Sequence, residues 1–234
     1  MAPPRRGHRL LTGPSIMLPT LSPAVVIAAL VILLGSLVLS IKYERFRFAI
    51  DAFHTMVGKA GSWAILVLTI AISYEVFARY FLRRPTEWAF DLSYILFGVL
   101  FMLAGPYALA RNAHVRGDFL YREWPVRRQA ALDLVLYIVF FFPGVLALVY
   151  AGWGFAQFSW MIKEHSSNSP NGPPLYHFKT LIPLVGVMLS IQGSVEVARC
   201  IICLRTGAWP PRLSDVEETE RLILEEAQKK QGAA

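Results

Sequence analysis

Ionisable side chains lie within or at the edges of long apolar runs of this chain, where they could do chemistry. Glu75 and Arg79 are four residues apart, so they share one face of a helix. Asp91 lies near the start of the next run, and Glu196 and Arg199 are close together in the last one. A charge inside lipid is costly and normally faces protein or water. These residues therefore either line a pathway for an ion or substrate, or pair to hold helices or subunits together.

The pairing interpretation is favoured because the middles of these runs are Leu, Ile, Val and Phe, whereas an ion pathway needs polar groups through the membrane. A tight turn at 83–86 places Arg79 and Asp91 at similar depth, which predicts an ion pair between them. Glu75 is one turn deeper, and its candidate partners are Arg79, a neighbouring hydroxyl or a separate subunit. Trp88, at the start of the next run, completes this group of candidate interface residues.

A second candidate group lies toward the opposite membrane surface. Glu196 and Arg199 match in depth the basic connection that precedes the fourth apolar run. The candidate residues in that connection are Arg111, His114, Arg116 and Asp118. The prediction for all of them is structural ion pairing, within the chain or with a partner subunit.

The sequence carries no recognisable set for catalysis or for binding a cofactor. Cys200 and Cys203 have C-x-x-C spacing, but a zinc site needs more ligands nearby, so plain thiols at a helix end are expected. A haem-carrying bundle needs His or Met ligands inside the helices. The histidines fall outside the apolar runs or at their edges: His8, His54, His114, His165 and His177. No nucleotide-binding, zinc-protease or serine-hydrolase motif is present. We therefore expect no enzyme activity, no metal and no cofactor.

The elements that must position these residues are five apolar stretches, at 23–41, 61–82, 88–110, 130–160 and 180–204. The shortest would cover about 28 Å as a helix, close to the ~30 Å hydrocarbon core of a bilayer. Because lipid offers no hydrogen-bond partners, each stretch is predicted to be a helix. Apolar residues make up 55% of the chain, and the net charge of +7 comes from basic residues between the runs, which indicates a membrane rather than nucleic acid. The predicted fold class is an all-α integral membrane protein.

Basic residues concentrate at 42–60, at 111–129 and after 205, and the positive-inside rule places these segments in the cytoplasm. The core at 61–205 is then four transmembrane helices with both ends inside, and the connection at 163–179 faces outward. The helix at 23–41 is an extra one that either spans the membrane or lies at it. Three arginines precede it as in a signal peptide, but no small-x-small cleavage site follows.

The remaining segments are a polar N-terminus at 1–22, the stretch at 42–60 and a C-terminal tail at 206–234. Within 42–60, Phe46, Ile50, Phe53 and Val57 recur at helical spacing, which predicts an amphipathic helix at the cytoplasmic interface, or one packed on a partner. The tail reads S-x-x-E at 214–217 with lysines at 229–230, which predicts a solvated cytoplasmic helix over about 215–230.

Several short motifs, in this order and spacing, resemble one family. They are EVFARY at 75–80, PTEW at 85–88, DLSY at 91–94, GPYAL at 105–109, NAHVRGD at 112–118, PPLY at 173–176, KTLIP at 179–183 and QG at 192–193. Over about 51–205 the chain resembles the small membrane subunit of TRAP (tripartite ATP-independent periplasmic) transporters, the DctQ-like family, in its mannitol/chloroaromatic-type branch. The extra helix at 23–41 and the tail depart from the usual four-helix pattern of that family.

The resemblance implies a sodium-coupled importer of organic acids in the bacterial inner membrane. Its other parts would be a large DctM-like membrane subunit that moves as an elevator and a periplasmic DctP-like substrate-binding protein. The small subunit would brace the large one, surrounded by membrane lipid, and help dock the binding protein. Two other functions stay open at this point: a small membrane anchor of a redox or other enzyme complex, and an independent channel or carrier. The absence of inverted repeats of broken helices argues against the latter.

Overall fold

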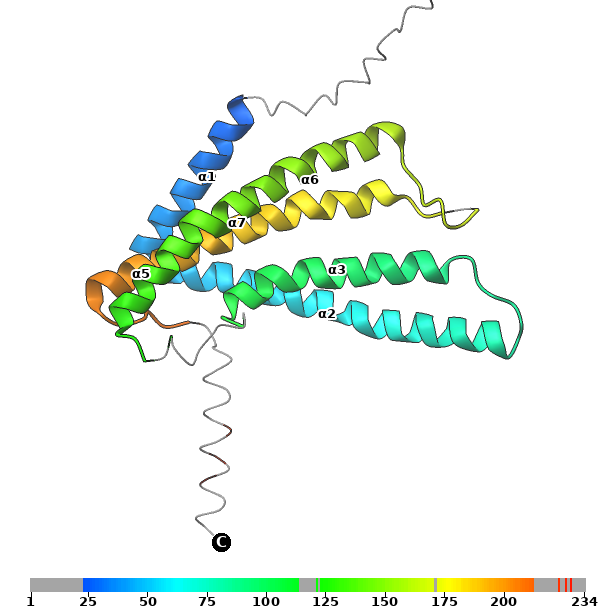
Figure 1. Cartoon of the computed structure of the whole chain (residues 1–234), viewed down its shortest axis with the longest axis horizontal. Coiled ribbons are helices and arrows are strands. Elements are labelled where there is room, and N and C mark those ends of the chain that lie inside the picture. Colours follow the sequence, from blue (N-terminus) through cyan, green and yellow to red (C-terminus); the bar gives the residue numbers. More distant parts are fainter. Residues whose placement is uncertain are drawn as a thin grey trace, which may run out of the picture.

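The computed structural model describes residues 23–113, 121, 123–170 and 172–212, together with the single positions 223, 226 and 228. These residues form a chain of helices without paired strands (Figure 1). The helices are α1 (Pro23–Lys42), α2 (Glu44–Tyr80), α3 (Ala89–Ala110), α5 (Val126–Leu136), the π-helix η1 (Tyr137–Phe141), α6 (Phe142–Ile162) and α7 (Leu175–Thr206). The predicted N-terminal segment at 1–22 lies outside the described residues, and so does the tail helix apart from the three single positions.

The predicted all-α membrane class is confirmed, and the described part of the chain holds four helices long and apolar enough to cross a bilayer. They are α2, α3, the continuous helix Val126–Ile162 that joins α5, η1 and α6, and α7. The apolar stretch at 23–41 is helical as α1. Whether α1 spans the membrane, and which way the core is oriented, stay predictions.

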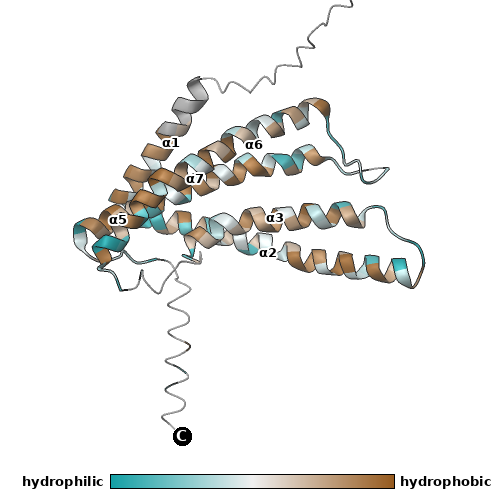
Figure 2. Cartoon of the chain, in the orientation of Figure 1, coloured by the Kyte–Doolittle hydropathy of each residue, from teal (hydrophilic) through white to brown (hydrophobic). Residues whose placement is uncertain are grey.

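α7 is the central helix of the fold. In the most apolar part of each membrane-length helix, 67% of the residues are buried in α7, against 11% in α2 and α3 and 6% in Val126–Ile162. α2 pairs with α3 and α6 pairs with α7, while α1, α3 and α5 also contact α7 (Figure 1). The outer helices therefore expose most of their side chains, and these are largely apolar (Figure 2).

The stretch at 42–60 is not a separate element, because it continues into 61–80 as the single helix α2 of 37 residues. Such a helix is about 55 Å long, well beyond the ~30 Å hydrocarbon core. Its apolar stripe includes Phe53, which is half exposed, whereas the neighbouring face buries Arg47, Asp51 and His54. The first third of α2 therefore packs mainly by its polar face, and its apolar stripe stays partly exposed beside that face.

A π-helical turn interrupts the third membrane-length helix, Val126–Ile162, at Tyr137–Phe141, just before Pro143. Proline lacks the amide that an α-helix needs at that point, and an extra residue in the turn accommodates it. The turn places Phe141 against Gly193 of α7, where an added Cβ would lie only 2.4 Å from the ring. The π-turn and Gly193 therefore fix how this helix lies on α7.

Close helix approach also depends on glycine at the crossing of α2 and α3. A Cβ built on Gly58 would lie 2.5 Å from Cβ of Tyr107. Because a Cβ atom moves only with its backbone, the two helices would have to separate. Small residues that permit such approach are the usual basis of helix packing in membranes.

We expect Gly58→Ala to lower the free energy of unfolding by about 1–3 kcal/mol, the usual range for overpacking. The matched control is Gly144→Ala, because a Cβ at Gly144 meets no atom within 4 Å. The control should gain the roughly 0.5–1 kcal/mol that alanine offers in a helix. Denaturant titration in detergent micelles measures both variants, and equal stabilisation of the two would contradict the tight crossing.

Candidate functional site

Six polar side chains from α2, α7 and the segment after α7 form one connected group, which we call the buried charge network. Arg199 is its centre and is 0% exposed. One guanidinium nitrogen, Nη2, donates to Asp51 of α2, and the other, Nη1, donates to Glu196 of the same helix. The members of the network are Asp51, His54, Gln192, Glu196, Arg199 and Arg212.

The network continues on both sides of Arg199. The second oxygen of Glu196 accepts a hydrogen bond from Nη2 of Arg212 at 2.8 Å. This bond holds the segment after α7 against that helix. Gln192 donates from Nε2 to Oδ1 of Asp51 at 2.9 Å, and its Oε1 bonds Nδ1 of His54 at 2.8 Å. Two carboxylates and two guanidiniums thus alternate, so the four charges balance.

This geometry fixes the register of α2 against α7. Taking a charge out of water is unfavourable by several kcal/mol unless its partners are well placed, and removing one partner leaves the other charge stranded. Asp51, His54 and Arg47 lie on one face of α2, while Gln192, Glu196 and Arg199 lie along one side of α7. Sliding α2 along α7 by one turn would break the bonds of Asp51 and His54 to α7.

Sequence reasoning missed Asp51, His54 and Gln192 as members of this site. It placed the partners of Glu196 and Arg199 in the 111–118 connection, whereas the carboxylate that holds Arg199 comes from α2. A signal was available, because Arg47, Asp51, His54 and Gly58 recur at spacings of 4, 3 and 4, which marks one helix face.

The structure places one of the candidates from that connection. Arg111 ends α3, and its backbone N–H donates to the carbonyl of Tyr107 at 3.0 Å. The other three candidates, His114, Arg116 and Asp118, lie outside the described residues.

At the opposite end, Asp91 and three residues of the 163–174 loop form a second site, which we call the Asp91 clamp. Asp91 is 0% exposed, and its Oδ1 accepts from Oγ of Ser166 at 2.5 Å and from Nδ2 of Asn168 at 3.4 Å. Its Oδ2 accepts from the hydroxyl of Ser169. The carboxylate therefore holds the loop between α6 and α7 against the start of α3.

The predicted ion pair between Arg79 and Asp91 is wrong, since the described residues show each of them with other partners. Arg79 donates from Nε and Nη2 to Oε1 of Glu75, at 2.9 and 2.5 Å. The second oxygen of Glu75 accepts from the backbone amide of Thr86 at 3.0 Å and from the Thr86 hydroxyl. Arg79 and Glu75 already lie side by side once the helix forms, so this pair is favoured over a pair between Arg79 and Asp91 across the turn.

Two further contacts order this end of the molecule. Trp88 stacks on Tyr74 of α2 with ring centroids 6.1 Å apart. The ammonium of Lys179 bonds both oxygens of Glu164, at 2.7 and 2.5 Å. These hydrogen bonds hold the pKa of Glu164, in the loop that follows α6, below its ordinary value.

The described residues offer no cluster of His, Cys, Asp and Glu that could hold a metal ion. Cys200 and Cys203 are buried thiols that form no disulfide. Each acidic side chain within a membrane-length helix, beyond the first residue, accepts a hydrogen bond from another side chain of the chain. These are Asp51, Glu75, Asp91, Asp133 and Glu196. The polar groups of the helices thus hold this chain together.

Fold and site together define a multi-pass membrane protein whose charged groups serve its own packing. The family model described as "Tripartite ATP-independent periplasmic transporters, DctQ component" matches residues 68–202. The chain belongs to this family and is a small membrane subunit of a TRAP transporter. No curated protein matches it significantly.

We expect Arg199→Gln to lower the free energy of unfolding by about 3–5 kcal/mol, because Asp51 and Glu196 would face each other without their cation. Adding Asp51→Asn should recover part of the loss. The control is Arg205→Gln, which removes an exposed arginine from the same helix. Denaturant titration in micelles measures the three variants, and an Arg199→Gln protein as stable as the control would refute the network's role.

Asp91→Ala should release the 163–174 loop while the helices stay packed, because three side chains lose their shared acceptor. The readout is hydrogen exchange at the amides of Ser166 and Leu175, which donate to Pro173 and Glu164 across the loop. Exchange there should accelerate, and exchange within α7 should not change. Glu87→Ala is the control, since Ser169 bonds only the backbone carbonyl of Glu87. Unchanged loop exchange in Asp91→Ala would show that the clamp does not hold the loop.

Proposed function

We propose that this subunit braces the large DctM-like subunit of a sodium-coupled TRAP transporter that imports organic acids, and that it transports nothing itself. The observation that carries the proposal is the internal bonding of every acidic group within the membrane-length helices beyond their first residues. A transport pathway needs polar groups that face substrate or water. Here those groups bond to other side chains of the same chain.

The outer faces of α2, α3 and α6 support a bracing role. They expose large apolar side chains over much of their length, including Trp63 at 68%, Phe101 at 68% and Trp153 at 52%. Rigid helices with such faces suit lateral packing against another membrane protein as well as contact with lipid. α7, buried at the centre, gives these faces a fixed backing.

The loop end suits contact with a periplasmic DctP-like binding protein. The Asp91 clamp joins the 163–174 loop to α3, and Glu75 holds the turn through Thr86. Two connections that lie far apart in the sequence thus form one ordered surface. The distribution of basic residues supports placing this surface outside the cell and the buried charge network near the cytoplasm, in the inner membrane of a bacterium.

The test is uptake by proteoliposomes that contain this chain alone, the large subunit alone, or both, with binding protein and an inward sodium gradient. We expect uptake of an organic acid only when both membrane subunits are present. With Arg199→Gln, assembly and uptake should fall together, whereas Arg205→Gln should behave as wild type. Sodium-driven uptake by this chain alone would overturn the bracing role.

A further inference from the structure

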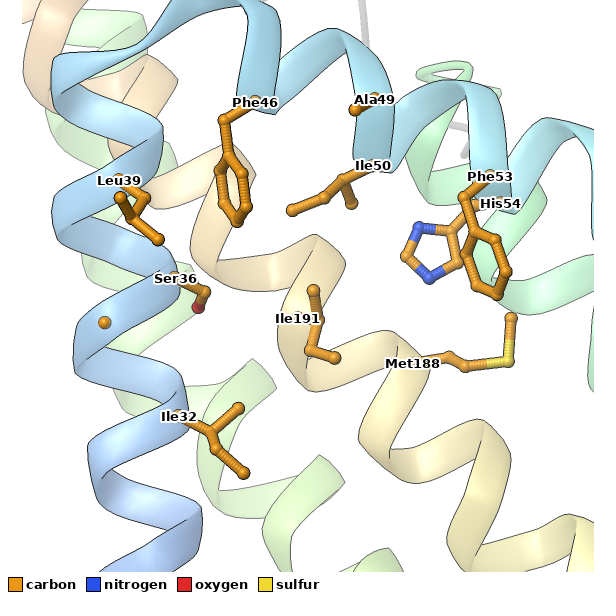
Figure 3. A pocket seen from close by; sticks show the side chains of 11 residues that line it. Ile32, Ser36, Leu39, Phe46, Ala49, Ile50, Phe53, His54, Met188 and Ile191 are labelled. Carbon is orange, nitrogen blue, oxygen red and sulfur yellow. The ribbon is translucent and has the colours of Figure 1, made fainter.

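An apolar groove runs between α1, the first third of α2 and α7, on the side of α2 that carries the apolar stripe. Its volume is about 530 Å³, within the ~300–1,000 Å³ range of small-molecule sites. Figure 3 shows the α2 side chains pointing across it toward α7, with α1 forming the other wall. The wall includes Ile32, Leu39, Phe46, Ile50, Met188 and Ile191.

The groove is held open by contacts that attach α1 at fixed points. Oγ of Ser36 bonds Oγ of Ser194 at 2.6 Å, which ties α1 to α7. Nη1 of Arg47 donates to the carbonyl of Ser40 at 2.7 Å, which ties α1 to α2. Next to Ser36 the wall leaves open space, because a Cβ added at Gly35 would meet no atom within 4 Å.

The residues that line the groove favour a hydrocarbon ligand. Only Ser36 and His54 bring polar side chains to it, and both are already bonded, to Ser194 and to Gln192. A ligand inside the groove would therefore gain contact area but few new hydrogen bonds. A lipid acyl chain, which has no polar groups to satisfy, meets this condition.

The rim of the groove at the α1–α2 elbow carries positive charge. Lys42, three residues after the wall residue Leu39, and Arg45, next to the wall residue Phe46, are both exposed, and Glu44 is the one acidic residue at 42–47. Basic residues at the membrane surface attract anionic lipids, and guanidinium binds phosphate in a paired geometry. A carbon-lined groove that ends in a basic rim matches the tail and head of one molecule.

We propose that this groove is a binding site for one anionic phospholipid, with an acyl chain along the wall and its phosphate at Lys42 and Arg45. A transmembrane helix of a partner would also fill an apolar groove, but it would carry no fixed anionic group to the rim. Most of the wall, on α1 and the first third of α2, lies outside the residues that match the family, while Met188 and Ile191 lie within them.

The experiment uses the full-length chain, purified and delipidated in detergent, and titrates it with phosphatidylglycerol or phosphatidylcholine. Native mass spectrometry counts the bound lipid, and the melting temperature reports its effect. Wild-type protein should retain one phosphatidylglycerol and prefer it to phosphatidylcholine. The double variant Lys42→Gln/Arg45→Gln should bind phosphatidylglycerol roughly 30-fold more weakly, from about fivefold per basic residue. Its control is Arg128→Gln/Arg205→Gln, two exposed arginines elsewhere.

Gly35→Leu and Ala49→Leu fill the groove from opposite walls and should abolish retention of both lipids, with Gly144→Leu as the control. Equal retention in wild type and in both filled variants would overturn the site, and so would equal affinity for the two lipids. If Gly35→Cys cross-links to the large subunit in a complex that holds no lipid at the groove, a partner helix occupies it and the proposal fails. None of these results depends on uptake, so they leave the bracing role to its own test.

Discussion

The position of α7 depends on one guanidinium that cannot reach water. Arg199 lies between a carboxylate on its own helix and another on α2, so these two helices must meet at that point. Because an unpaired charge in a low-dielectric interior is strongly unfavourable, few other registers of α2 on α7 are available. α3 then follows α2 and α6 follows α7, so the buried charge network joins the two helical hairpins at one end and the Asp91 clamp joins them at the other.

The helices pack as expected for a protein that is surrounded by lipid and not by water. In water a helix buries its apolar face, but the first third of α2 buries Arg47, Asp51 and His54 and leaves Phe53 half exposed. Association of such helices cannot rely on the hydrophobic effect, so it depends on close packing and hydrogen bonds. The glycines at the helix crossings and the polar network supply these two contributions.

The helices themselves were predictable, because a bilayer requires apolar runs of fixed length, and the order of short motifs identified the family. The ends of the helices were less predictable than the helices themselves. α7 begins at Leu175, ahead of the apolar run, because backbone hydrogen bonding does not stop where hydropathy falls. The partners of the charged groups were the least predictable feature. Spacing reveals which residues share a helix face, but not which helix the face meets, so Asp51 was missed and Asp91 was given the wrong partner.

The contacts of Glu196 with Arg212, and of Arg199 with Asp51, set the limits of the cooperative unit. The family match spans 68–202, so both outer partners fall beyond it, one on each side. A fragment trimmed to the matched residues would keep the central pair of α7 but lose the groups that balance it. The shortest fragment that contains every member of the network runs from 51 to 212. The unit that folds is therefore larger than the unit that sequence comparison recognises.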